Sequence, residues 1–267
     1  IVGGDHDHRP AHVVAAAGIV KRALLAVRLA LSGLVFAPAE AAAHHEGDIA
    51  LDNIGGKIAI GTWGTGGILV PQSVFESRFN DTGVDPNWIN EPGFDSEQGT
   101  WAYPCTISFN ILDSLRVWDG SDFDAAASQQ VKITYSSHAS YTPLTPSVVS
   151  GFGVGVDSYG AWHRHLAFEL MDSGVAPGAF AADGIYLLKL ELLSSDPQVA
   201  KSDPFYMVLR QDENYLDGGI GSDSQHEAAA VYVETHLASV PEPSTAILAA
   251  IGVCAALWGM KRRKYCG

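Results

Sequence analysis

The sequence predicts an all-β protein with an antiparallel β-sandwich or jelly-roll body, for three reasons. Short segments between residues 44 and 240 alternate apolar and polar side chains with a period of two, as half-buried strands do. Turn residues such as Pro92-Gly93 and Asp119-Gly120 separate them at the spacing typical of sandwiches and jelly rolls. No helix of three turns is expected, because Gly and Pro interrupt every stretch with helical periodicity.

About ten segments are expected to form strands. In chain order they are 57–60, 74–79, 106–109, 116–118, 131–135, 149–156, 163–170, 185–192, 205–209 and 230–233. Segment 83–99 is rich in Pro, Gly and acidic residues and is expected to form a solvated loop, with a calcium-stabilised loop as the alternative.

Charge excludes one class of function. The 267 residues include 30 Asp and Glu against 16 Lys and Arg, and residues 44–240 hold 26 acidic residues and 8 basic ones. Such a body has no basic stripe to neutralise phosphates, so nucleic-acid binding is not expected.

Residues 1–43 have the pattern of a leader and a secretory signal peptide. Lys21-Arg22 precede an apolar run from residue 23 to residue 37, and Ala41 and Ala43 suit the −3 and −1 positions of a cleavage site. The body is therefore expected to begin at His44 after export. A buried N-terminal helix is the alternative.

The other end, residues 240–267, has a tripartite pattern. Pro241, Glu242 and Pro243 precede an apolar run, Thr245–Met260, which is followed by a basic cluster. The cluster consists of Lys261, Arg262, Arg263 and Lys264. As a helix the run would be about 24 Å long, short for a bilayer core of about 30 Å, and the cluster would stay on the cytoplasmic side.

This tail resembles the PEP-CTERM sorting signal of bacterial surface proteins. The resemblance implies a transient stop in the inner membrane, recognition and removal of the tail by an exosortase, and release to the cell surface or extracellular matrix. Extracellular polysaccharide is a partner that the resemblance also implies. A permanent tail anchor is the alternative.

A metal site is predicted on the segment 163–170. On a strand, His163, His165 and Glu169 would share one face while the apolar residues between them enter the core. Two imidazoles and a carboxylate suit Zn²⁺ or another first-row divalent metal. The alternative is a solvated strand face without metal.

A second candidate lies at the predicted mature start, where His44 and His45 are followed by acidic residues up to Asp48. A free α-amine beside an imidazole chelates transition metals well, and carboxylates add oxygen ligands. The alternative is an untethered terminus.

The body resembles the zinc-repressor-controlled PEP-CTERM proteins, most clearly in His163-Arg164-His165 followed by Gly184-Ile185-Tyr186-Leu187. The resemblance implies an extracytoplasmic, zinc-handling β domain, with His163 and His165 as the best-matched positions. His163, His165 and Glu169 also match half of the cupin metal motif, but the flanking glycines are out of register and the downstream partner motif is absent. A cupin-like metalloenzyme is therefore only an alternative.

Enzyme motifs are otherwise absent, since no nucleophile elbow, zinc-protease helix or phosphate-binding loop occurs. Cys105 is the one cysteine of the predicted body, which therefore has no internal disulfide. We expect a non-enzymatic protein. A matrix or carbohydrate-binding protein is the remaining alternative, with Trp88 and Trp101 as sugar-stacking residues.

Overall fold

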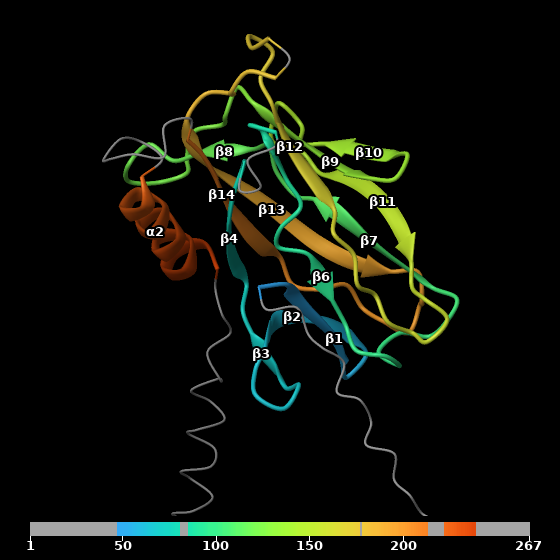
Figure 1. The fold of residues 1–267 in the computed structure, drawn as a ribbon. Coiled ribbons are helices and arrows are strands. Elements are labelled where there is room, and N and C mark those ends of the chain that lie inside the picture. Colours follow the sequence, from blue (N-terminus) through green and yellow to red (C-terminus); the bar gives the residue numbers. More distant parts are fainter. Residues whose placement is uncertain (1–46, 81–84, 177, 213–221, 239–267) are drawn as a thin grey trace, which may run out of the picture. The chain divides into compact units, whose positions relative to one another are not determined.

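The computed structural model describes residues 47–80, 85–176, 178–212 and 222–238, and in this part of the chain β-strands dominate (Figure 1). The strands are β1 (Ile49–Ile54), β2 (Lys57–Trp63), β3 (Leu69–Pro71), β4 (Val74–Arg78), β5 (Trp88–Ile89), β6 (Phe94–Asp95), β7 (Thr106–Ile111), β8 (Arg116–Val117), β9 (Gln130–Tyr135), β10 (His138–Tyr141), β11 (Val149–Gly155), β12 (Ala167–Met171), β13 (Gly184–Ser194) and β14 (Phe205–Gln211). Helix α2 (Asp223–Tyr232) continues into a π-helical turn, Val233–Leu237.

The described strands form three sheets, which confirms the all-β prediction. Their strand orders are β3-β2-β1-β6, β10-β9-β12-β5 and β11-β7-β13-β14-β4, and β8 pairs with β13. Most neighbours are antiparallel, but β1 pairs with β6 and β14 pairs with β4 in parallel. Two of the three sheets are therefore mixed, where a purely antiparallel arrangement was predicted, and the β10-β9-β12-β5 sheet is antiparallel throughout.

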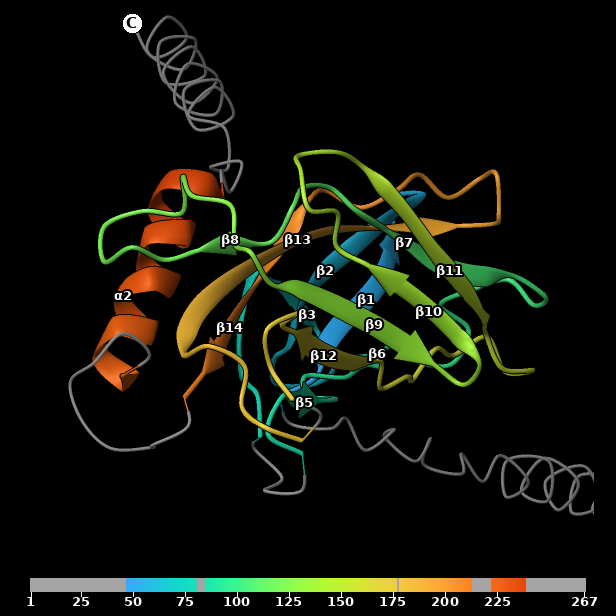
Figure 2. The same ribbon diagram turned by 90° about the horizontal axis from the view of Figure 1, so that it is seen from above.

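Strand β13 lies at the centre of the largest sheet and is apolar on both faces. Leu188 and Leu190 belong to the main core, whereas Ile185 and Leu187 belong to a second apolar cluster. Helix α2 (Figure 2) supplies Ala229 and Ala230 to that second cluster, and the π-helical turn that follows supplies Val233. A strand covered on both faces is expected to read as a nearly continuous apolar run, as this one does.

Helix α2 and the π-helical turn correct two predictions, because segment 230–233 is helical and the continuous helical stretch 223–237 exceeds three turns. The side chain of Ser222 accepts a hydrogen bond from the Gln225 amide and caps the helix N-terminus. Three consecutive alanines follow within the helix, and alanine has the highest helix propensity. The other nine predicted segments coincide with strands in whole or in part.

Segment 83–99 also differs from its prediction as a solvated loop. It contains β5 and β6, and residues 92–96 are all buried. Phe94 is completely buried against Trp162, with ring centroids 5.7 Å apart. The acidic residues of this segment therefore flank a buried strand, and Asp95 itself is only 8% exposed.

The predicted leader and signal peptide (1–43), His44, His45 and the predicted sorting signal (240–267) lie outside the described residues. Within the described part of the chain, no helix has the length and apolar character needed to cross a bilayer.

Candidate metal centre

Backbone pairing at Phe94 brings three distant segments together. On one side, β6 pairs in parallel with β1, so that Ile49 is opposite Phe94, and the Ile49 amide donates to the Gly93 carbonyl at 2.8 Å. On the other side, Phe94 and Arg164 form an antiparallel bridge with two hydrogen bonds of 2.9 Å each. Residues from near 49, 94 and 164 thus lie in one continuous sheet-like surface.

This register decides which side chains share a face. Paired residues in a sheet point to the same side, and their chain neighbours point to the other. Ile49 and Phe94 enter the core and are completely buried. Asp48 precedes Ile49, and His163 and His165 flank Arg164, the partner of Phe94, so all three project together on the opposite face.

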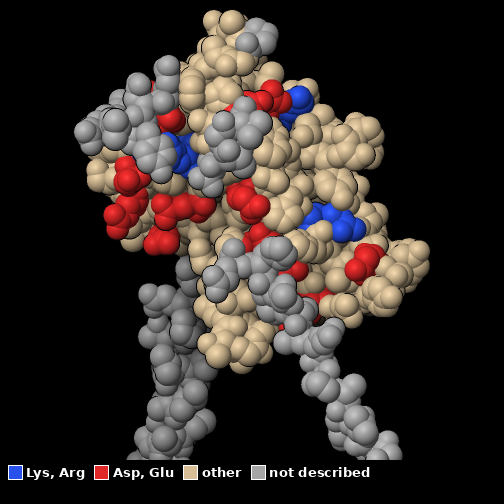
Figure 3. Space-filling model, viewed as in Figure 1, with Lys and Arg blue, Asp and Glu red and all other residues tan. Residues whose placement is uncertain are grey.

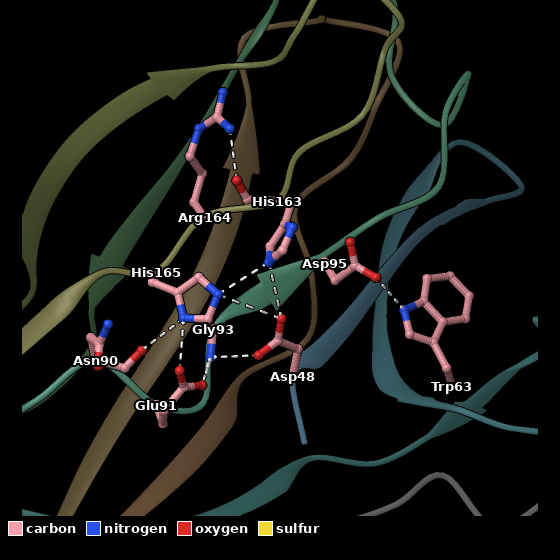
Figure 4. Close-up of polar contacts among 9 residues, drawn as sticks. All are labelled: Asp48, Trp63, Asn90, Glu91, Gly93, Asp95, His163, Arg164 and His165. Atoms are coloured by element: carbon pink, nitrogen blue, oxygen red, sulfur yellow. Dashed lines mark hydrogen bonds and ion pairs between the residues drawn. The ribbon is translucent and has the colours of Figure 1, made fainter. Parts of the chain in front are cut away.

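Three ligand atoms converge on that face (Figure 4). His163 Nε2 lies 3.1 Å from His165 Nε2, and Asp48 Oδ2 lies 3.3 Å from the first nitrogen and 3.8 Å from the second. Two ligands about 2.0–2.1 Å from a tetrahedral ion are about 3.3 Å apart. The three atoms are therefore spaced as the ligands of one first-row metal ion would be, and a metal site of Asp48, His163 and His165 is geometrically possible.

The surroundings of His165 fix its tautomer. Its Nδ1 lies 3.2 Å from the carbonyl oxygen of Asn90 and 3.1 Å from Oε1 of Glu91, both of which are acceptors. Neutral His165 therefore carries its proton on Nδ1 and directs the lone pair of Nε2 toward His163 and Asp48. A carboxylate behind the distal ring nitrogen is the usual outer-shell partner of a metal-bound histidine.

Asp48 supplies the most deeply buried oxygen of the cluster. Its side chain is 2% exposed, and Oδ1 accepts a hydrogen bond of 3.0 Å from the Gly93 amide. Its Oδ2 is buried, with no hydrogen-bond partner in the described part of the chain. An unsatisfied buried carboxylate oxygen is costly, and a cation between Oδ2 and the two imidazoles would satisfy it.

The charge around the cluster is negative. Asp48, Glu91 and Asp95 surround the two histidines, and Asp95 accepts a hydrogen bond of 3.0 Å from the Trp63 indole. Arg164 is close in sequence, but its guanidinium donates to the carbonyl oxygens of His163 and Gly155. The side chains of His163 and His165 are 37% and 28% exposed, so a cation reaches the cluster from solvent.

The structure therefore brings His163 and His165 together, as expected, but with Asp48 as the carboxylate. Glu169 lies four residues beyond His165, about 13 Å along an extended strand, so sharing its face does not bring it into the same site. Its Oε2 instead pairs with Lys132 Nζ at 2.8 Å. The signal that pointed to Asp48 was its place in the acidic run after His44 and His45, which themselves lie outside the described residues.

The tryptophans proposed to stack on sugars are less accessible than expected. Trp101 is 3% exposed and its indole donates to Ser96 Oγ at 2.8 Å, so its assignment as a sugar-stacking residue is wrong. Trp88 lies on β5 and is half-buried.

Burial raises the pKa of Cys105 above its usual value, which keeps the thiol protonated and unreactive.

Comparison with known proteins adds no family. No protein-family model matches the chain, and no curated protein matches it in sequence.

Proposed function

We propose that this protein binds one divalent transition metal ion, in the first place zinc, through Asp48, His163 and His165. The observation that carries the proposal is the convergence of two imidazole nitrogens and the buried Asp48 Oδ2 within 3.8 Å of one another. Two His and one carboxylate form a common donor set for Zn²⁺.

In this proposal the protein binds the ion or delivers it to another molecule, and it does not use the ion for catalysis. Three protein ligands leave at least one coordination position open, and the exposed edges of both imidazoles face solvent. His44 and His45 precede Asp48 by only four and three residues in the sequence, so they are candidates for a further ligand.

Export and surface sorting complete the proposal. The segment 21–43 and the Pro241-Glu242-Pro243 tail support export, transit through the inner membrane and processing by an exosortase-type enzyme. Mass measurement of the protein recovered from its producing cell tests both cuts, because cleavage after Ala43 makes His44 the first residue.

The decisive experiment is titration of Zn²⁺ into protein stripped of metal. We expect one ion per chain with a Kd of micromolar or tighter, which corresponds to about −8 kcal/mol. Asp48→Asn, His163→Ala and His165→Ala should each weaken binding by more than the roughly 10–100-fold loss caused by removing an outer-shell partner.

His138→Ala is the matched control, because His138 is exposed on β10 and stacks on Phe152 away from the cluster. Wild-type affinity in the three cluster variants would contradict the proposed ligands. Two His and one carboxylate also bind non-haem Fe(II), so a clear preference for Fe²⁺ in a competition titration would favour the cupin-like alternative.

A further inference from the structure

A second site is suggested by an apolar groove of about 610 Å³ that shares no residue with the metal cluster. It lies between β2 and β3 on one side and the start of β14 on the other, beside the end of the π-helical turn. Its apolar lining includes Ile54, Ile60, Leu69, Pro71, Pro204 and Leu237. This volume falls within the range of small-molecule sites.

One wall of the groove is uncharged and unusually exposed. Residues 61–73, which form the β2–β3 hairpin, contain no charged side chain, and the corresponding lobe is uniformly tan in Figure 3. Ile54, which lines the groove, is 55% exposed, and Ile68 and Val70, which adjoin the lining residue Leu69 in the chain, are 68% and 50% exposed. Such clustered apolar exposure on an acidic protein is typical of a binding surface.

The opposite wall is fixed by a hydrogen bond between sheet and helix. The hydroxyl of Tyr206 on β14 donates to the Leu237 carbonyl at 3.0 Å. Lys189 on β13 is the cross-strand partner of Tyr206, and its Nζ lies 5.5 Å from the centre of the Tyr206 ring. The lysine is thereby held at the edge of the groove that it lines.

Lys189 differs from the other cation of the groove. Lys57 Nζ pairs with the Asp203 carboxylate at 2.7 Å, which neutralises both. For Lys189, no carboxylate partner is found within the described ranges. The groove therefore carries a net positive charge at Lys189, although the whole chain has a net charge of −14.

We infer that this groove binds a small amphipathic carboxylate of the fatty-acid type. Its carboxylate would pair with the Lys189 ammonium, and its alkyl chain would lie on Ile60, Leu69 and Pro204. Charge complementarity with Lys189 selects an anionic head group. The net negative charge of the chain does not prevent this, because repulsion from carboxylates beyond about 8 Å is screened at physiological salt. Burial of the alkyl chain supplies the apolar part of the affinity.

The test compares decanoate with decanol in calorimetric titrations of the full chain. Decanoate should bind about tenfold more tightly than decanol, because only the anion pairs with Lys189. Lys189→Met keeps the apolar stem and removes the charge, so it should abolish this preference while decanol binding is unchanged. Ile54→Asp, at an exposed position of the lining, should weaken both ligands.

Lys132→Met is the matched control, because Lys132 is a partly exposed lysine on β9 and does not line the groove. Absence of decanoate binding, or an equal loss of binding in the Lys132 variant, would overturn the inference. So would binding of decanoate only after Glu242→Gln, which would show that the chain's own acidic segment after Ala238 occupies the groove. A dimer that decanoate dissociates would assign the groove to a second copy and overturn it likewise.

Discussion

Gly93 shows how one missing side chain shapes the cluster of Asp48, His163 and His165. In the register around Phe94, Gly93 lies between Asp48 and His165 on the ligand face. A Cβ atom at this position would lie 2.7 Å from His165 Cε1 and 2.9 Å from Asp48 Oδ1, closer than real contacts allow. The two ligands reach each other only because nothing stands between them.

The substitution Gly93→Ala should therefore impair metal binding more than folding. The added methyl group must displace the imidazole of His165 or the carboxylate of Asp48, and we expect the Kd for Zn²⁺ to rise at least about tenfold. Calorimetric titration measures the affinity, and circular dichroism measures the remaining fold.

Gly155→Ala serves as the control, because a Cβ at Gly155 meets nothing within 4 Å. Equal affinities of the two alanine variants would show that the ligands do not need this close approach.

Part of this cluster was predictable from the sequence. The spacing of His163 and His165 was sufficient, because residues two apart on extended chain share a face whatever the sheet around them. Asp48 belongs to the same site only through the pairing of β1 with β6, which joins segments 45 residues apart. Local periodicity contains no information on such pairing, and it favoured Glu169 for that reason.

At the scale of elements, β13 carries a tyrosine, Tyr186, whose pKa is strongly raised. Tyr186 is 1% exposed, and its hydroxyl donates to the Ala182 carbonyl at 2.8 Å. Burial raises its pKa far above the usual value of 10.0, with Asp172 and Asp183 adding to the effect. Above pH 10 the unfolded chain releases this proton while the folded chain keeps it, so stability falls as the pH rises.

Urea unfolding between pH 8 and pH 11 tests this linkage. We expect the free energy of unfolding to decline above about pH 10 in the wild type and to decline less steeply in Tyr186→Phe. At neutral pH the same variant should be less stable by about 1 kcal/mol, through loss of the hydroxyl's hydrogen bond.

Tyr103→Phe is the control, because Tyr103 is 64% exposed. Parallel pH profiles for the wild type and Tyr186→Phe would show that other groups cause the alkaline decline.

Helix α2 shows why element type was predicted less well near the C-terminal end of the body. The alternating residues Val231 and Val233 suggested a strand, but Ala229, Ala230 and Val233 follow the spacing of a helix face. Tertiary packing on Ile185 and Val208 decides between the two, because that face of the sheet would otherwise be exposed.

For the whole molecule, the cluster of Asp48, His163 and His165 joins the start of β1 to the segment before β12. An ion that binds the folded chain and not the unfolded chain stabilises it by about 2.7 kcal/mol at a hundredfold excess over Kd. We expect Zn²⁺ at this excess to raise the Tm of the wild type by several degrees, measured by thermal unfolding.

Asp48→Asn should remove most of this shift, and Mg²⁺ should cause little of it, because Mg²⁺ prefers oxygen ligands in octahedral geometry. An equal zinc shift in Asp48→Asn would place the stabilising ion elsewhere in the chain.

The sheet order is the part of the fold that the sequence predicted least. Period-two alternation identified most long strands, but it does not say which strands are neighbours. The pairing of β4 with β14 places Val74 opposite Tyr206, and no turn links such distant segments directly. Five strands were also missed: β3, β5 and β6, where two or three residues are too few to show a period, and the longer β1 and β10.

The distance along the chain between the ligands has a consequence for biosynthesis. Asp48 leaves the ribosome 115 residues before His163. At about 5–20 residues per second, roughly 6 to 23 seconds separate the appearance of the first ligand from that of the second. A nascent chain that ends before His163 lacks the site entirely, so a metal ion bound there could act only on later steps of folding, with β13 and β14 still to follow in the chain.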